Sequence, residues 1–275
     1  MLSFLHTFEP QPIAFQLGFI RLYWYGIFMV LGIFFGIFLL LWLAKKYGID
    51  RDSVYDFAFY LVIFSLLGAR IYAVLLFPSH YSENPLEIVQ VWKGGLAIHG
   101  AVIAGMLTLW WYARKKQQPF WLWADMLVLS LSFGQVLGRW GNYFNQELFG
   151  TPTNAPWGIP IEPQNIPQEF QGFTHFHPTF LYESILNFCV FLVILFLHTR
   201  RMRDTDKQTR KYGNIALVYL ILYSFVRIAM EQFRIDETPV FLGLRFPVFI
   251  SIVIISASIA FLFQKNSKKS KNTAN

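Results

Sequence analysis

The chain has 275 residues, of which 55% are hydrophobic, 19% are aromatic and only 14% are charged, with a mean hydropathy of +0.42. Soluble domains carry about 25% charged residues, so this composition excludes an ordinary soluble protein and indicates a polytopic membrane protein. The net charge of +7 would also suit a nucleic-acid-binding protein, but its distribution along the chain argues against that function.

Seven apolar stretches are long enough to cross a bilayer as helices, which takes about 20 residues each. They cover residues 20–43, 54–77, 95–113, 120–138, 179–198, 213–231 and 246–263. The sequence therefore predicts an all-α polytopic membrane protein in which residues 1–275 form a single seven-helix transmembrane domain.

The basic residues alternate from one connection to the next. Sixteen of the 23 lie after the first, third and fifth stretches and in the tail: Lys45, Lys46, Arg51, Arg114, Lys115, Lys116, Arg200, Arg201, Arg203, Lys207, Arg210, Lys211, Lys265, Lys268, Lys269 and Lys271. By the positive-inside rule, the C-terminus is cytoplasmic and the N-terminus is outside. The basic excess is thus a topology signal, and no nucleic-acid partner is predicted.

Two features shape the predicted bundle beyond its spans. The connection 142–177, between the fourth and fifth spans, is rich in Pro, Gly, Gln and Asn, which predicts an ordered, turn-rich cap on the outer side. The pairs Gly32–Gly36 and Gly134–Gly138 have the spacing that lets two helices approach closely.

Several polar groups lie in the outer parts of the predicted spans. Arg70, Arg139, Arg227 and His99 come from four different spans, and Tyr25 lies near the outer end of the first. Polar groups within a membrane are costly, so this pattern predicts a cavity that opens to the outer leaflet. Because a guanidinium binds phosphate oxygens through two parallel hydrogen bonds, a lipid phosphate is the expected ligand.

The stretch Gly138–Gly150 combines charge, amides and glycine at the end of the fourth span. It contains Arg139, Asn142 and Glu147 among aromatic residues. These groups either form a site or belong to a helix end whose polar side chains reach the membrane interface.

Two further patterns each allow two interpretations. Tyr223, Arg227 and Glu231 share one face of the sixth span at i, i+4 and i+8. Either Arg227 and Glu231 neutralise each other, or Glu231 steers Arg227 toward an anion. His99 is either a base that titrates near pH 7 or a structural histidine.

Other kinds of chemistry find no support. No Cys/His spacing resembles a zinc site, and neither a phosphate-binding glycine loop nor Gly-x-Ser-x-Gly occurs. The single cysteine, Cys189, lies in an apolar run, where packing is its expected role. We predict no metal and no cofactor.

The thirteen residues Gly-Arg-Trp-Gly-Asn-Tyr-Phe-Asn-Gln-Glu-Leu-Phe-Gly at Gly138–Gly150 resemble the signature of the bacterial prolipoprotein diacylglyceryl transferases. Four further stretches resemble other motifs of that family, in the same order: 24–26 (Trp-Tyr-Gly), 94–100 (Gly-Gly-Leu-Ala-Ile-His-Gly), 177–183 (His-Pro-Thr-Phe-Leu-Tyr-Glu) and 223–231. Together they cover most of the chain.

The resemblance implies an enzyme of the bacterial inner membrane with its active site, and the cap, toward the periplasm. This family transfers the sn-1,2-diacylglyceryl group of phosphatidylglycerol to the thiol of the lipobox cysteine of a prolipoprotein signal peptide. A thioether forms and glycerol 1-phosphate leaves, which is the first step of bacterial lipoprotein maturation.

The resemblance also implies the site residues. Arg139 and Arg227 are catalytic, with Tyr25, His99, Asn142, Glu147, Gly150, Tyr223 and Glu231 around them. We add Arg70 to the phosphatidylglycerol-binding set from its position alone. Whether it touches lipid or only props the helices apart stays open.

The step that activates the substrate thiol has two candidate explanations. His99 is the best-placed general base, and we count it as catalytic, but a nearby arginine could instead favour the thiolate directly.

Two other classes of membrane protein compete with the enzyme. A transporter would have polar groups through the full membrane depth, whereas the inner halves of these spans are nearly all apolar and no repeat is evident. A non-catalytic lipid-binding protein would need the arginines but not His99.

Overall fold

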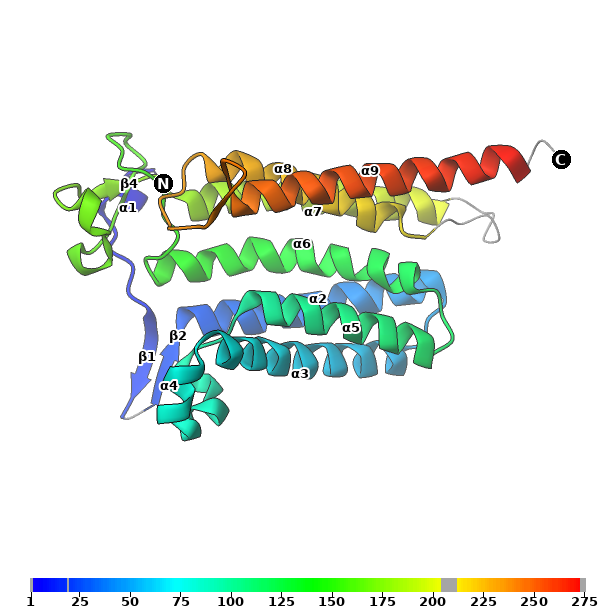
Figure 1. Ribbon diagram of the computed structural model, residues 1–275, viewed down its shortest axis with the longest axis horizontal. Helices are drawn as coiled ribbons and strands as arrows, with labels where there is room; N and C mark the ends of the chain where they lie inside the picture. The colour runs from blue at the N-terminus through cyan, green and yellow to red at the C-terminus, as the bar shows by residue number, and fades with distance from the viewer. Residues whose placement is uncertain (1, 19, 204–211, 273–275) are drawn as a thin grey trace. The chain divides into compact units, whose positions relative to one another are not determined.

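The computed structural model describes residues 2–18, 20–203 and 212–272 and is mostly helical (Figure 1). Among these residues, six helices are long and apolar enough to cross a membrane. They are α2 (Trp24–Tyr47), α3 (Arg51–Leu76), α6 (Phe120–Phe144), α7 (Thr179–Arg203), α8 (Asn214–Glu231) and α9 (Phe246–Asn272). The prediction of an all-α polytopic membrane protein is therefore confirmed.

The predicted span 95–113 corresponds to α5 (Ile98–Lys115), which is not one of these six helices. Its 18 residues include His99 at the start and Arg114 and Lys115 at the end, which lower its hydropathy. The helix is present where it was expected, but a seventh membrane span stays a prediction.

Several helix ends differ from the predicted boundaries, and two of these differences affect the site. Residues 20–23 form β2 (Ile20–Tyr23), which pairs antiparallel with β1 (Ile13–Leu17), so α2 begins only at Trp24. The fourth span was expected to end at residue 138, but α6 continues to Phe144 and carries the first half of the glycine-rich signature in helical form.

The chain forms two compact units, and the larger comprises Met1–Phe38 and Val128–Asn275. Within it, α7, α8 and α9 pack side by side (Figure 1). The N-terminal part of α2 packs on α6, because a Cβ on Gly36 would lie 3.6 Å from that of Ser130, whose hydroxyl donates to the Gly36 carbonyl at 2.8 Å. The predicted close approach at Gly32–Gly36 is confirmed.

The same unit holds the connection between α6 and α7, which is ordered and turn-rich as predicted. It contains β3 (Ile159–Pro160), η3 (Pro163–Asn165), η4 (Gln168–Phe170) and β4 (His175–Phe176), and β3 pairs antiparallel with β4. A small apolar core forms beneath it, to which α1 (Leu2–Thr7) contributes Leu5.

A buried amide that the sequence analysis did not identify joins three segments around this core. Gln146 donates to the Pro10 carbonyl at 2.8 Å, and its Oε1 accepts from the Glu162 amide at 2.7 Å and from Asn165 at 3.1 Å. The N-terminal segment and the α6–α7 connection therefore share one hydrogen-bonded centre.

The second unit, Leu39–Leu127, is built on α3 and α5. After α3, the chain forms α4 (Pro78–Glu83), η1 (Pro85–Val89) and η2 (Val91–Lys93) before it enters α5. Asp50 caps the start of α3 by accepting from the Ser53 amide at 2.7 Å, and that hydrogen bond lowers the pKa of Asp50.

The crossing of α3 and α5 depends on two glycines. A Cβ on Gly100 would collide with the Gly68 carbonyl and with the Cβ of Tyr72, and one on Gly68 would collide with Ala104. The two backbones thus touch directly, which is the packing that small residues allow between membrane helices.

We predict that Gly100→Ala destabilises the protein by about 1–3 kcal/mol, because the added methyl forces the two backbones apart. The melting temperature of the detergent-purified protein measures the effect. Gly134→Ala is the matched control, since a Cβ there meets nothing within 4 Å. Equal melting temperatures for the two variants would contradict the prediction.

Candidate active site

A buried carboxylate holds two arginines at the start of α7. Glu183 Oε2 lies 2.7 Å from Nη2 of Arg139 on α6, and its Oε1 lies 2.9 Å from Nη2 of Arg234, which follows α8. The Glu183 side chain is only 4% exposed and that of Arg234 only 6%. Three segments distant in sequence are therefore joined by one carboxylate.

A second carboxylate repeats this arrangement at the end of α8. Glu231 Oε2 lies 2.9 Å from Nη2 of Arg227, one helical turn earlier, and its Oε1 lies 2.8 Å from Nε of Arg245 at the start of α9. Its side chain is 1% exposed. The intrahelical pair considered from the sequence is present, but Arg227 shares its carboxylate with another arginine.

These two groups place an excess of positive charge in a buried region. Four guanidinium groups surround two carboxylates, so each Arg–Glu–Arg group carries one net positive charge. A buried carboxylate is stable only with such partners, and removal of one partner of a buried ion pair costs about 3–5 kcal/mol.

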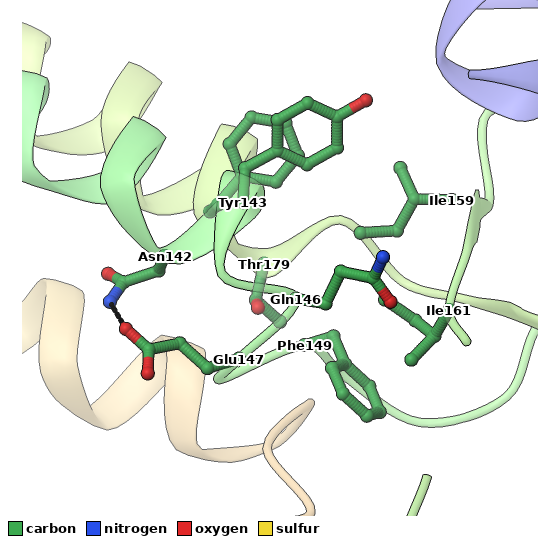
Figure 2. Close-up of a pocket in the computed structure, with 9 residues that line it drawn as sticks. Asn142, Tyr143, Gln146, Glu147, Phe149, Ile159, Ile161 and Thr179 are labelled. Atoms are coloured by element: carbon green, nitrogen blue, oxygen red, sulfur yellow. Dashed lines mark hydrogen bonds between the residues drawn. The ribbon is translucent and has the colours of Figure 1, made fainter. Parts of the chain in front are cut away.

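Arg139 also begins a chain of hydrogen bonds along its own segment. Its Nη1 donates to Asn142 Oδ1 at 3.3 Å, and Asn142 Nδ2 donates to Glu147 Oε1 at 2.7 Å, the dashed line in Figure 2. Asn142 is one helical turn after Arg139 because α6 extends to Phe144. The structure thus brings together three of the residues that the signature singled out.

Two tyrosines flank these charges. The ring of Tyr25 lies against Gly141, where a Cβ would be 2.6 Å from a ring carbon, and its hydroxyl is close enough to Arg139 and Glu147 to interact with both charges. Tyr223, one turn before Arg227 on α8, stacks on Tyr219 with ring centroids 6.0 Å apart. Both tyrosines belong to the same unit as the two Arg–Glu–Arg groups.

Gly150 joins the α6–α7 connection to the segment that carries Arg234. It forms an isolated antiparallel bridge with Arg234, and its amide donates to the His177 carbonyl at 3.0 Å. A Cβ here would lie 2.9 Å from both His177 Cβ and Thr179 Cγ2. Gly150 therefore contributes through its backbone, because the absence of a side chain lets the neighbouring segments approach closely.

His177 adds no further charge to this region. Burial lowers the pKa of His177, and its Nδ1 lies 3.2 Å from the Tyr182 hydroxyl. The imidazole is therefore neutral at pH 7.

A small pocket lies beside the Arg139–Asn142–Glu147 chain (Figure 2). Asn142, Glu147, Gln146 and Thr179 give it polar walls, and apolar side chains such as Phe149 close it. The space between these side chains does not admit even a water-sized sphere, whereas ligand sites for drug-sized molecules begin at roughly 300 Å³. By itself, it has no room for a whole lipid.

The two arginines of the signature motifs differ in their unused donors. Within the part of the chain that the structure describes, Arg227 pairs only with Glu231 through Nη2, which leaves Nε and Nη1 available. Arg139 engages Nη2 with Glu183 and Nη1 with Asn142, which leaves its Nε. Arg227 thus keeps hydrogen-bond donors on two of its three guanidinium nitrogens for an anion.

Arg70 belongs to the second unit, where it organises the segment after α3. Its Nε donates to the Ile88 carbonyl at 2.9 Å, and its Nη1 donates to the carbonyls of Gly94 and Gly95 at 2.8 and 2.7 Å. The same Nη1 lies 3.0 Å from the Tyr81 hydroxyl, and Nη2 donates to the Glu87 carbonyl. All three guanidinium nitrogens are engaged with protein groups.

His99 also belongs to the second unit. It lies in the first turn of α5 and is exposed, with its ring centroid 5.9 Å from that of Tyr72. Its convergence with Arg139 and Arg227 stays a prediction.

Arg234 and Arg245 were not assigned to the site from the sequence. Both are among the seven basic residues that the positive-inside rule leaves unexplained. Their positive charge on the side where the rule expects none was the sequence signal that could have identified them.

The chain is similar to known proteins over most of its length. A family model described as "Prolipoprotein diacylglyceryl transferase" matches residues 12–264. The phosphatidylglycerol–prolipoprotein diacylglyceryl transferase of Trichormus variabilis is 41% identical over 236 residues, which are 86% of this chain and 83% of that protein. Proteins of the same name from Synechocystis sp. and Thermosynechococcus vestitus are 38% and 37% identical, over 94% of this chain and 92% and 94% of theirs.

The contacts of Arg70 lead to a prediction about the segment 78–97. Arg70→Gln removes most of the donors that hold its carbonyls, so we expect faster amide hydrogen exchange there while the helices stay protected. Hydrogen-exchange mass spectrometry measures this, with Arg51→Gln, an exposed arginine of α3, as the control. Unchanged protection of residues 85–97 would refute the structural role of Arg70.

Proposed function

Because the chain belongs to the prolipoprotein diacylglyceryl transferase family, we propose that it moves the sn-1,2-diacylglyceryl group of phosphatidylglycerol to the thiol of a lipobox cysteine. The protein is a transferase that acts in the first step of lipoprotein maturation, with phosphatidylglycerol and prolipoproteins as substrates. In the proposed reaction, a thioether forms and glycerol 1-phosphate leaves.

The observation that carries this proposal is the pair of Arg–Glu–Arg groups. Four arginines surround the two buried glutamates, and Asp236 and Glu147 beside them balance the remaining charge, so the attraction for phosphate comes from the guanidinium donors that the carboxylates leave unused. A phosphodiester carries one negative charge, and the departing glycerol phosphate carries more. Such a site therefore favours the product side of the cleavage, where charge accumulates.

The arginines have distinct proposed roles. Arg227 offers Nε and Nη1 to the phosphate oxygens, and Arg139 offers its Nε while Asn142 and Glu183 fix its orientation. Tyr25, Glu147, Tyr223 and Glu231 complete the proposed substrate site, with Gly150 as the backbone junction. Arg70 is left out of the phosphate-binding set because its nitrogens already bind carbonyl groups.

The transfer itself requires a nucleophile that the substrate supplies. The lipobox thiolate attacks the glyceryl carbon, the carbon–oxygen bond to phosphate breaks, and the electron pair stays on the phosphate oxygen. Preorganised arginines stabilise that charge, and the loss of one such donor typically costs about 2.7–4 kcal/mol. The thiol proton goes to His99 or, in the alternative, is lost because an arginine favours the thiolate.

The placement in the membrane is part of the proposal. We place the protein in the bacterial inner membrane with α5 as the seventh span, a cytoplasmic C-terminus, and the segment 142–177 and the active site on the periplasmic side. Basic residues in the last turns of α2, α5 and α7 support this orientation. Lys207, Arg210 and Lys211 of the same pattern lie outside the described residues.

The function is tested by incubation of the purified protein with phosphatidylglycerol and a lipobox peptide. The wild type is expected to add the mass of one diacylglyceryl group to the peptide and to release glycerol phosphate. Arg139→Ala and Arg227→Ala should lose transfer by about 10²–10³-fold each. Because each variant removes one partner of a buried carboxylate, a lower melting temperature is expected, and retained helix content in detergent at the assay temperature is the control for folding. Arg227→Lys should also be poor, because a point charge replaces a two-pronged donor. Near-normal glycerol phosphate release by the alanine variants would overturn the phosphate-binding role.

The role of His99 is tested separately by His99→Gln. If the imidazole is the base, transfer should fall by about 10²–10⁴-fold, and the low-pH limb of the rate profile, where a histidine base is protonated, should disappear. Measurement of transfer between pH 5 and 9 distinguishes the two explanations. An unchanged rate and profile would make His99 structural and leave arginine-assisted thiolate formation.

A further inference from the structure

We propose that Arg245 is a positioning residue for the transfer. It holds one oxygen of Glu231, so Arg227 contacts the other oxygen through a single nitrogen and keeps its remaining nitrogens for the phosphate. The inference rests on the proposed function of the Arg227 site. It concerns a residue outside the five motifs that carry the family resemblance.

Arg245 is held on several sides by the segment that follows α8. Its Nη1 donates to the Arg234 carbonyl at 2.8 Å and its Nη2 to the Asp236 carbonyl at 2.6 Å. Its Nε lies 3.0 Å from the Thr238 hydroxyl and 2.8 Å from Glu231 Oε1. The single Nε hydrogen is donated to Thr238, so the approach of Glu231 Oε1 to Nε is a charge contact and not a second hydrogen bond. The guanidinium therefore has one fixed orientation, with its positive charge against Glu231.

Arg245 lies in a short β-hairpin. Val240 of β5 (Val240–Phe241) pairs with Arg245 of β6 (Leu244–Arg245), and the Phe246 amide donates to the Pro239 carbonyl at 2.7 Å. The side chain of Arg245 thus fills the loop that connects α8 to α9. Its side chain is 31% exposed, against 1% for the carboxylate that it contacts.

The consequence for Arg227 follows from the geometry of guanidinium–carboxylate pairs. Such pairs readily become bidentate, with two parallel hydrogen bonds, when both carboxylate oxygens are available. The Arg245 cation lies against Oε1 and Arg227 contacts Oε2, and both are charge contacts, because neither oxygen accepts a hydrogen bond among the described residues. Without Arg245, Glu231 would draw a second nitrogen of Arg227 into the pair and remove the donors that a phosphate needs.

A double-mutant cycle tests the proposal with Arg245→Gln, Arg245→Lys, Glu231→Gln and the double variant Arg245→Gln/Glu231→Gln. Arg245→Gln should raise KM for phosphatidylglycerol about tenfold while kcat falls less. Arg245→Lys should recover part of the loss, because it restores the charge. The double variant should be no worse than Glu231→Gln, since Arg245 acts only through that carboxylate. Arg200→Gln, an exposed arginine on α7, is the control.

The outcomes separate this proposal from the proposed function. If the wild type itself transfers no diacylglyceryl group, the proposed function fails. If the wild type is active but the two substitutions are additive, or Arg245→Gln leaves KM within twofold, the positioning role is overturned. Should Arg245→Gln fold poorly, Arg245→Lys takes its place, because it keeps the charge but loses the hydrogen bonds that fix the guanidinium, and its KM should rise more than twofold. An unchanged KM in Arg245→Lys would then overturn the role.

Discussion

The sharing of each buried glutamate by two arginines is the interaction on which the larger unit depends. Glu183 and Glu231 are almost completely buried, and a lone carboxylate would be very unstable in such surroundings. Two cations on each carboxylate remove that instability and leave positive charge over. The same contacts therefore stabilise the fold and create an attraction for an anion, which explains why neither can be altered alone.

The backbone is arranged to bring the second arginine of each group into place. Gly150 forms a bridge with Arg234, and the amide of Thr151 donates to the Phe233 carbonyl at 2.8 Å. Gln146, four residues earlier, holds the N-terminal segment and the α6–α7 connection together. The backbone contacts that close that connection therefore also place Arg234 beside Glu183.

Hydropathy was sufficient to locate the long helices, since a run of about 20 apolar residues has few alternatives in a membrane. It could not locate the start of α2, because β2 is set by its pairing with β1. It also could not show that α6 continues past residue 138, because the polar residues there are stabilised by Glu183 from another helix.

The site was predictable where its partners are close in sequence. The spacing of Arg139, Asn142 and Glu147 indicated a connected group, whereas the partnership of Glu231 with Arg245 spans an entire hairpin. Arg70 is the opposite case. Its place in a predicted span suggested a lipid contact, but in the structure its donors are occupied by carbonyl groups of the segment that follows α3.

The contacts of Arg70 restrict how the segment between α3 and α5 can evolve. Most of its partners are backbone carbonyls, which every residue type possesses, so substitutions at 87 and 88 leave the acceptors in place. Gly94 and Gly95 differ, because both have a positive φ that favours glycine. An insertion or deletion would instead carry some of these carbonyls beyond the reach of a single guanidinium. Outside the two glycines, the segment is therefore permissive toward changes of residue type and intolerant of changes in length, which is the reverse of the usual behaviour of a surface loop.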